Sequence, residues 1–116
     1  MLARRQASRT VAEDRMALTT QTYAEQLGRA FAEAAHGDEN IVEVWVSTRP
    51  GGVDIWVLTR PIDLEAEKLL YRYKSAVYAH FKTADYQIYT VNPRNFRDGG
   101  RSAIPGHAVQ IPLQMG

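Results

Sequence analysis

Cysteine is absent from the 116 residues, which excludes a disulfide framework, an iron–sulfur cluster, a zinc finger and a thiol nucleophile. Long apolar runs are also absent, since no stretch approaches the roughly 20 residues that a membrane-spanning helix needs. No apolar stretch follows the N-terminal arginines, so a secretory signal is not indicated and we expect a cytoplasmic protein. The length suits one domain with one modest core.

The chain has almost no excess of one charge sign, because its formal net charge is only +1, but the charged residues are unevenly distributed along it. Residues 1–10 carry +3 and residues 92–116 carry +2, whereas residues 11–91 carry −4. Two basic tails on an acidic body can indicate a polyanionic partner, and they can equally be solvated termini. We therefore divide the chain into a basic N-terminal arm (1–10), a single α+β domain (11–92) and a Gly/Pro-containing C-terminal tail (93–116).

Two helices are predicted from capping residues and apolar periodicity. Thr10 and Glu13 have the spacing of a capping box, which predicts a helix from residue 11 to about residue 36, ended by Gly37. Asp63 is a plausible N-cap for a second helix from about residue 64 to residue 82. The core-facing stripes are Tyr23, Leu27, Ala30, Phe31 and Ala34 in the first helix, and Ala66, Leu69, Leu70, Tyr73, Ala76, Val77 and Phe81 in the second.

A β-hairpin is predicted between these helices. Residues 41–48 and 53–59 are rich in β-branched and aromatic residues, and Arg49-Pro50-Gly51-Gly52 lies between them as a turn. This loop pairs Thr48 with Val53 and Trp45 with Trp56. One face of the hairpin is then entirely aliphatic, with Val42, Val44, Val46, Val53, Ile55 and Val57. The other carries Glu43, Trp45, Ser47, Asp54, Trp56 and Leu58.

A third strand is predicted over residues 86–91 and ends at Asn92-Pro93. In the tail, only residues 108–111 could form a short edge strand. The order α-β-β-α-β, with a right-handed crossover, predicts a two-layer α+β sandwich. We expect a three-stranded mixed sheet that contains the hairpin and has both helices on its aliphatic face.

The second face of this sheet has no predicted element to cover it. Exposed tryptophan and tyrosine side chains on one face are typical of interfaces and are rare on a monomer without a use. Three interpretations remain open: two copies pack face to face, the C-terminal tail folds across the face, or a ligand or foreign partner binds there. The predicted interface residues are Glu43, Trp45, Asp54, Trp56, Leu58 and Tyr89.

Catalytic patterns are weak. The stretch from Ser47 to Trp56 is similar in part to the Gly-Ser…Asp-x-Asp signature of minimal nucleotidyltransferases, in which two carboxylates hold magnesium. Trp56 stands at the second carboxylate position and Val46 at the glycine position, so we do not assign that family. Glu43 and Asp54 share a face without facing each other, and Glu65 and Glu67 suit a helix N-terminus. We interpret these acids as surface carboxylates.

No cofactor or metal is expected. His36, His80 and His107 share no helical or strand spacing, and no phosphate loop or dinucleotide fingerprint is present. The sequence therefore favours a non-catalytic protein–protein interaction module, homodimeric or part of a larger assembly. The alternative is a nucleic-acid-binding accessory protein, and a degenerate nucleotidyltransferase is third. The alternative uses the tails and the basic, aromatic side of the second helix, through Arg4, Arg5, Arg9, Lys68, Arg72 and Lys82.

Overall fold

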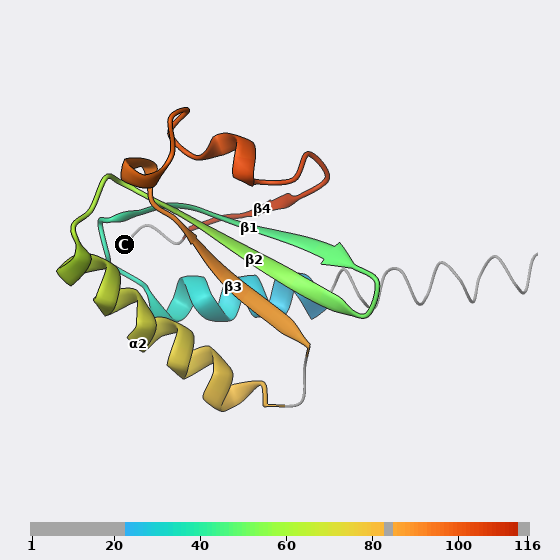
Figure 1. Ribbon diagram of the computed structural model, residues 1–116. Coiled ribbons are helices and arrows are strands. Elements are labelled where there is room, and N and C mark those ends of the chain that lie inside the picture. Colours follow the sequence, from blue (N-terminus) through green and yellow to red (C-terminus); the bar gives the residue numbers. More distant parts are fainter. Residues whose placement is uncertain (1–22, 83–84, 114–116) are drawn as a thin grey trace, which may run out of the picture.

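The computed structural model describes residues 23–82 and 85–113 and has the expected α+β class. Helix over residues 23–34 is followed by β1 (Ile41–Arg49), β2 (Gly52–Thr59), α2 (Leu64–His80) and β3 (Tyr86–Val91). Two short 3₁₀ helices, η1 (Pro93–Asn95) and η2 (Arg101–Ala103), precede β4 (Val109–Ile111). Both long helices lie on one face of the sheet, and the segment between β3 and β4 runs over the other face (Figure 1). The expected capping box at residue 10 and the start of the first helix lie outside the described residues.

The sheet has four strands, so the expectation of three was wrong. Its order is β3-β2-β1-β4, with β2 and β3 parallel and the other neighbours antiparallel. The fourth strand, β4, is the short edge strand that the sequence suggested within residues 108–111. It forms because Val46 and Val44 of β1 pair with Val109 and Ile111. Ile111 is buried there and Leu113 packs against the core, so the tail contributes apolar side chains to the core.

The hairpin register is confirmed by the pairs Thr48–Val53 and Trp45–Trp56. Arg49 also pairs with Gly52, which shortens the loop to Pro50-Gly51, and Gly51 supplies the positive φ of +79°. The prediction was wrong at Val42. A register shift between Ile41 and Glu43 turns Val42 outward to 43% exposure and buries Ile41 in its place. A β-bulge has this effect because it reverses side-chain alternation locally.

The crossover from β2 to β3 begins at the predicted cap. The carboxylate of Asp63 accepts a hydrogen bond from the Ala66 N–H at 2.9 Å, and α2 then runs beneath the sheet to His80 (Figure 1). Its buried residues are Leu70 and Val77, both from the predicted stripe. Leu69, which the same stripe included, is 37% exposed.

The core lies between the helices and the aliphatic face of the sheet. Leu27 and Phe31 of the first helix, Leu70 and Val77 of α2, and the inward residues of the strands are buried together. At Gly28 the first helix approaches the sheet so closely that a Cβ atom would lie 2.6 Å from Val46 Cγ1. This packing leaves the opposite face of the sheet to the polar and aromatic residues of the hairpin.

Candidate interaction surface

The segment between β3 and β4 covers part of the second sheet face, which agrees in part with the interpretation that the C-terminal tail folds across it. Gly100 lies against the Val91 side chain, where a Cβ would approach Cγ1 to 2.4 Å. An ion pair of 3.2 Å joins Arg101 to Glu43, and the Nε2 atom of His107 lies 3.4 Å from the Thr48 carbonyl oxygen. Leu58 is buried at 5% exposure. The tail therefore covers the Leu58–Val91 end of the face.

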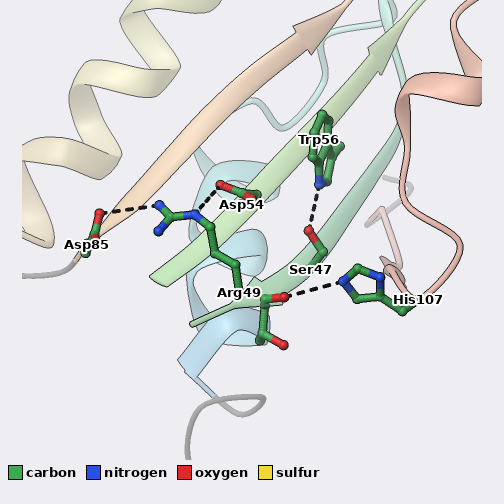
Figure 2. Close-up of polar contacts among 7 residues, drawn as sticks. Ser47, Arg49, Asp54, Trp56, Asp85 and His107 are labelled. Atoms are coloured by element: carbon green, nitrogen blue, oxygen red, sulfur yellow. Dashed lines mark hydrogen bonds and ion pairs between the residues drawn. The ribbon is translucent and has the colours of Figure 1, made fainter. Parts of the chain in front are cut away.

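The uncovered part centres on two stacked rings, Trp56 of β2 and Tyr89 of β3. Their centroids lie 4.5 Å apart at an interplanar angle of 19°, and Tyr89 is 41% exposed. The residues are held together because the parallel register places them directly side by side. The indole N–H of Trp56 donates to the Ser47 hydroxyl at 2.9 Å, which fixes the ring from β1 (Figure 2). This is a pre-organised aromatic surface with one ring open to solvent.

Trp45 lies half-buried beside these rings, opposite Trp56 in the hairpin. Its indole N–H donates to the Glu43 carboxylate at 3.2 Å. The other oxygen of that carboxylate meets Arg101, so Glu43 links the indole to the tail. We call Trp45, Trp56 and Tyr89 the aromatic surface.

A charged cluster borders the aromatic surface at the hairpin turn. Arg49 contacts the Asp54 carboxylate at 3.1 Å and the Asp85 carboxylate at 3.4 Å (Figure 2). Gly52 permits this geometry, because the guanidinium lies where a Cβ atom would stand. Hydrogen bonds to Asp85 and then Asp54 raise the pKa of Arg49. One guanidinium is shared by two carboxylates, so the cluster stays net acidic while both acids are held at the hairpin turn.

A second exposed set of aromatic residues lies on the flank of α2 that faces β3. Tyr71 and Tyr78 are 63% and 42% exposed, and the Tyr78 ring stacks on Tyr86 of β3 at 5.2 Å. The Lys74 ammonium lies 5.2 Å from the centroid of the Tyr71 ring. Burial lowers the pKa of Lys74, and the nearby Glu67 offsets part of that effect. No sequence argument had joined these tyrosines to the third strand, because the stack depends on how α2 packs.

An open groove of about 530 Å³ separates the first helix from α2 on the outer side of the helical layer. Its floor is formed by small and apolar side chains such as Ala30, Ala76 and Phe81, with Arg29 and His80 at the rim. The titratable side chains that line the groove are Arg29, Glu33 and His80.

The structure brings together most of the predicted interface residues. Trp45, Trp56 and Tyr89 share the aromatic surface, while Glu43 and Asp54 lie at its margin in ion pairs. Leu58 is the exception because it is buried. Of the predicted nucleic-acid residues, Lys68 and Arg72 lie exposed on α2, and Lys82 lies exposed just after it. Arg4, Arg5 and Arg9 lie outside the described residues.

Comparison with protein-family models, with curated proteins and with solved structures finds no match. Among residues 23–82 and 85–113, no three histidine, aspartate or glutamate side chains gather as a metal site requires. No helix in the same part of the chain is long and apolar enough to cross a membrane. The functional proposal therefore rests on the geometry of the second sheet face.

Proposed function

We propose that this protein is a non-catalytic protein–protein interaction module that binds its partner through the aromatic surface of Trp45, Trp56 and Tyr89. The observation that carries the proposal is the Trp56–Tyr89 stack, which holds a 41% exposed phenol in one fixed orientation. Tyrosine and tryptophan dominate interface hot spots because they bury large areas at low entropic cost.

The surroundings of the stack support this function. Asp54 and Glu43 form ion pairs at its margin, and a polar rim around an aromatic centre is the usual anatomy of an interface. The tail already covers the Leu58 end of the face, so packing of the whole face onto a second copy would require its displacement. A partner on the uncovered part would contact side chains of β1, β2 and β3.

A photo-crosslinking phenylalanine analogue at position 89 tests the proposal. We expect a crosslinked protein adduct in cells that produce the chain, and its mass distinguishes a second copy from a foreign protein. The matched control carries the analogue at position 42, which is equally exposed at 43% but lies on the bulge. Equal crosslinking at positions 89 and 42, or none at either, would overturn the proposed function.

A Tyr89→Ser variant adds a quantitative test. Loss of a central aromatic contact costs about 2 kcal/mol, which weakens binding roughly 30-fold. The Val42→Ser variant removes a similarly exposed apolar side chain away from the surface and should bind as the parent does. The affinities of the two variants can be measured with the partner, once the mass of the crosslinked adduct has identified it.

A nucleic-acid-binding role is the second candidate, and the composition of α2 favours it. Residues 72–82 contain Arg72, Lys74 and Lys82 and no acid, beside the exposed rings of Tyr71 and Tyr78. Cations beside exposed rings can hold a nucleic-acid backbone and stack bases. Binding of labelled RNA or DNA that weakens as salt increases, and weakens further on Arg72→Ala, would support this role.

A further inference from the structure

The two edges of the sheet differ in how well they are protected against pairing. The β4 edge is three residues long and is followed by Pro112. The β3 edge is six residues long, with neither a charge nor a proline between Tyr86 and Val91. In the described part of the chain no strand pairs with the outer side of β3. A long, uncharged edge is a template for another strand, which monomeric proteins normally block.

The backbone of β3 presents a regular set of groups on its outer side. The Val53 N–H donates to the Asp85 carbonyl at 3.0 Å, and Val53 is the register partner of Tyr86. In a parallel ladder every second residue bonds to the same neighbour, so residues 85, 87, 89 and 91 bond toward β2. Tyr86, Ile88 and Thr90 therefore direct their N–H and C=O groups away from the sheet.

The exposed flank of α2 continues this edge in the helical layer. Tyr78 stacks on Tyr86 of β3, and Tyr71 is seven residues earlier on the same side of the helix. The outer side of β3 and the Tyr71–Tyr78 flank thus form one surface that spans both layers of the sandwich.

We propose that this surface binds a second copy of the chain, with β3 pairing antiparallel to the partner's β3 about a two-fold axis at Ile88. The proposal goes beyond the proposed function, because it uses a second surface of the protein and names the partner. The pairs Tyr86 with the partner's Thr90, Ile88 with the partner's Ile88, and Thr90 with the partner's Tyr86 each exchange both backbone hydrogen bonds. The two sheets join into one of eight strands, and α2 packs beside the partner's α2.

The spacing along the helix agrees with that axis. From Tyr86 to Ile88 the strand advances about 6.6 Å, which equals about four residues of helix. Since Tyr78 stacks on Tyr86 and α2 runs opposite to β3, the helix is level with Ile88 near Lys74. A two-fold axis between residues 74 and 75 sets Tyr71 against the partner's Tyr78. It also sets Glu67 toward the partner's Lys82.

Charge complementarity favours a second copy over a foreign strand. Residues 63–71 of the α2 region carry a net charge of −2, and residues 72–82 carry +3 with histidine neutral. Because the two-fold axis makes the helices antiparallel, the acidic half of each meets the basic half of the other. On the other sheet face Gln87 would stand beside the partner's Tyr89, so the ring that stacks on Trp56 would lie next to the dimer contact.

Sedimentation equilibrium of the full chain tests the pairing, with a dimer of twice 13.1 kDa expected at micromolar concentrations. Thr90→Pro removes an outward N–H that β2 does not use, so the monomer should keep its fold while the dimer is lost. Unchanged far-UV circular dichroism and an unchanged urea midpoint for the diluted protein would confirm that the fold is intact.

A charge exchange tests the helix contact independently. Glu67→Lys should raise the dimer dissociation constant about tenfold, because two symmetric ion pairs become repulsive. Lys82→Glu should do the same, and the double variant should restore the parental value. Within one chain the two positions lie about 22 Å apart, so such a rescue acts between copies. Glu65→Lys is the matched control, since it makes the same charge change two residues from Glu67, about 200° around the helix and so away from that flank.

A monomer at every concentration, or a dimer unaffected by both Thr90→Pro and Glu67→Lys, would overturn the pairing. The proposed function would survive either result if the crosslinker at position 89 still captured a protein. Conversely, a dimer that is lost with Thr90→Pro, with no preference for crosslinking at position 89 over position 42, would support the β3 pairing and remove the role of the aromatic surface.

Discussion

The side-chain amide of Asn92 bonds to both backbone groups of Ile62, across 30 residues of chain. Its Nδ2 donates to the Ile62 carbonyl at 2.9 Å, and its Oδ1 accepts from the Ile62 N–H at 3.3 Å. Both residues are buried, and Oδ1 also accepts from the Arg94 N–H at 3.2 Å. Asn92 therefore fixes the entry to α2 against the exit of β3.

Replacing Asn92 with alanine should lower the free energy of unfolding by about 1–3 kcal/mol, because the buried Ile62 N–H loses its acceptor. The Ile62 carbonyl keeps only the longer contact of 3.4 Å from the Arg94 guanidinium. Asn92→Asp, although nearly isosteric, should also destabilise, since a carboxylate cannot donate to the Ile62 carbonyl. Urea denaturation measures both. Asn95→Ala, at an exposed position of the adjoining η1 helix, is the control and should stay within about 0.5 kcal/mol of the parent.

At Gly28 the first helix lies close against the sheet, so an alanine there should have the opposite effect on stability to that expected from helix propensity. Alanine in place of glycine normally stabilises a helix by about 1 kcal/mol. Here the new Cβ would lie 2.6 Å from Val46 Cγ1 and 2.7 Å from Ile111 Cγ1, in buried packing. Overpacking of this kind costs about 1–3 kcal/mol, so Gly28→Ala should lower the urea midpoint.

Gly106→Ala is the matched control for Gly28. Apart from its two chain neighbours, no atom of the described residues lies within 4 Å of a Cβ at Gly106, and its φ is not positive. This variant should leave the midpoint unchanged or slightly higher. A Gly28→Ala variant that is as stable as the Gly106→Ala variant would show that the helix does not approach β1 and β4 so closely.

Local patterns were enough to predict the hairpin, its register, α2 with its Asp63 cap, and β3. Each of these depends on residues that are neighbours in the chain or across one tight turn. The position of β4 depends instead on Val44 and Val46, more than 60 residues away, so a three-residue strand followed by proline could only be suggested. Val42 was misplaced because a bulge interrupts alternation without any residue that marks it.

The sequence predicted which residues share the second sheet face, but not which of them the tail covers. Trp45, Trp56 and Tyr89 share a face as the alternation required. The burial of Leu58 was missed because it depends on the tail, which carries little periodicity but is held by Gly100 against Val91 and by Arg101 on Glu43. The basic, aromatic side of the second helix was predicted, but its contact with β3 through the Tyr78–Tyr86 stack was not, because that contact follows from the packing of α2.

Two tyrosines make the stability of the fold sensitive to alkaline pH. Burial, then the hydrogen bond to Asp38, raises the pKa of Tyr73 to about 12. Burial, then nearby Tyr78 and Tyr23, raises the pKa of Tyr86 to about 12. A phenol in the unfolded chain titrates near pH 10. Between about pH 10 and pH 12 the unfolded chain therefore loses these protons while the folded chain keeps them, and the free energy of unfolding should fall across that window.

Phenylalanine substitutions separate the contributions of Tyr73 and Tyr86 to this loss of stability. Tyr73→Phe should cost about 1 kcal/mol even at neutral pH, because the 2.8 Å hydrogen bond to Asp38 is lost. Tyr86→Phe should cost little there, since the Tyr86 hydroxyl is buried without a hydrogen-bond partner among the described residues. Each variant should flatten the loss of stability above pH 10, as followed by urea denaturation at stepped pH. A parental slope in both variants would mean that neither phenol keeps its proton through the packing described.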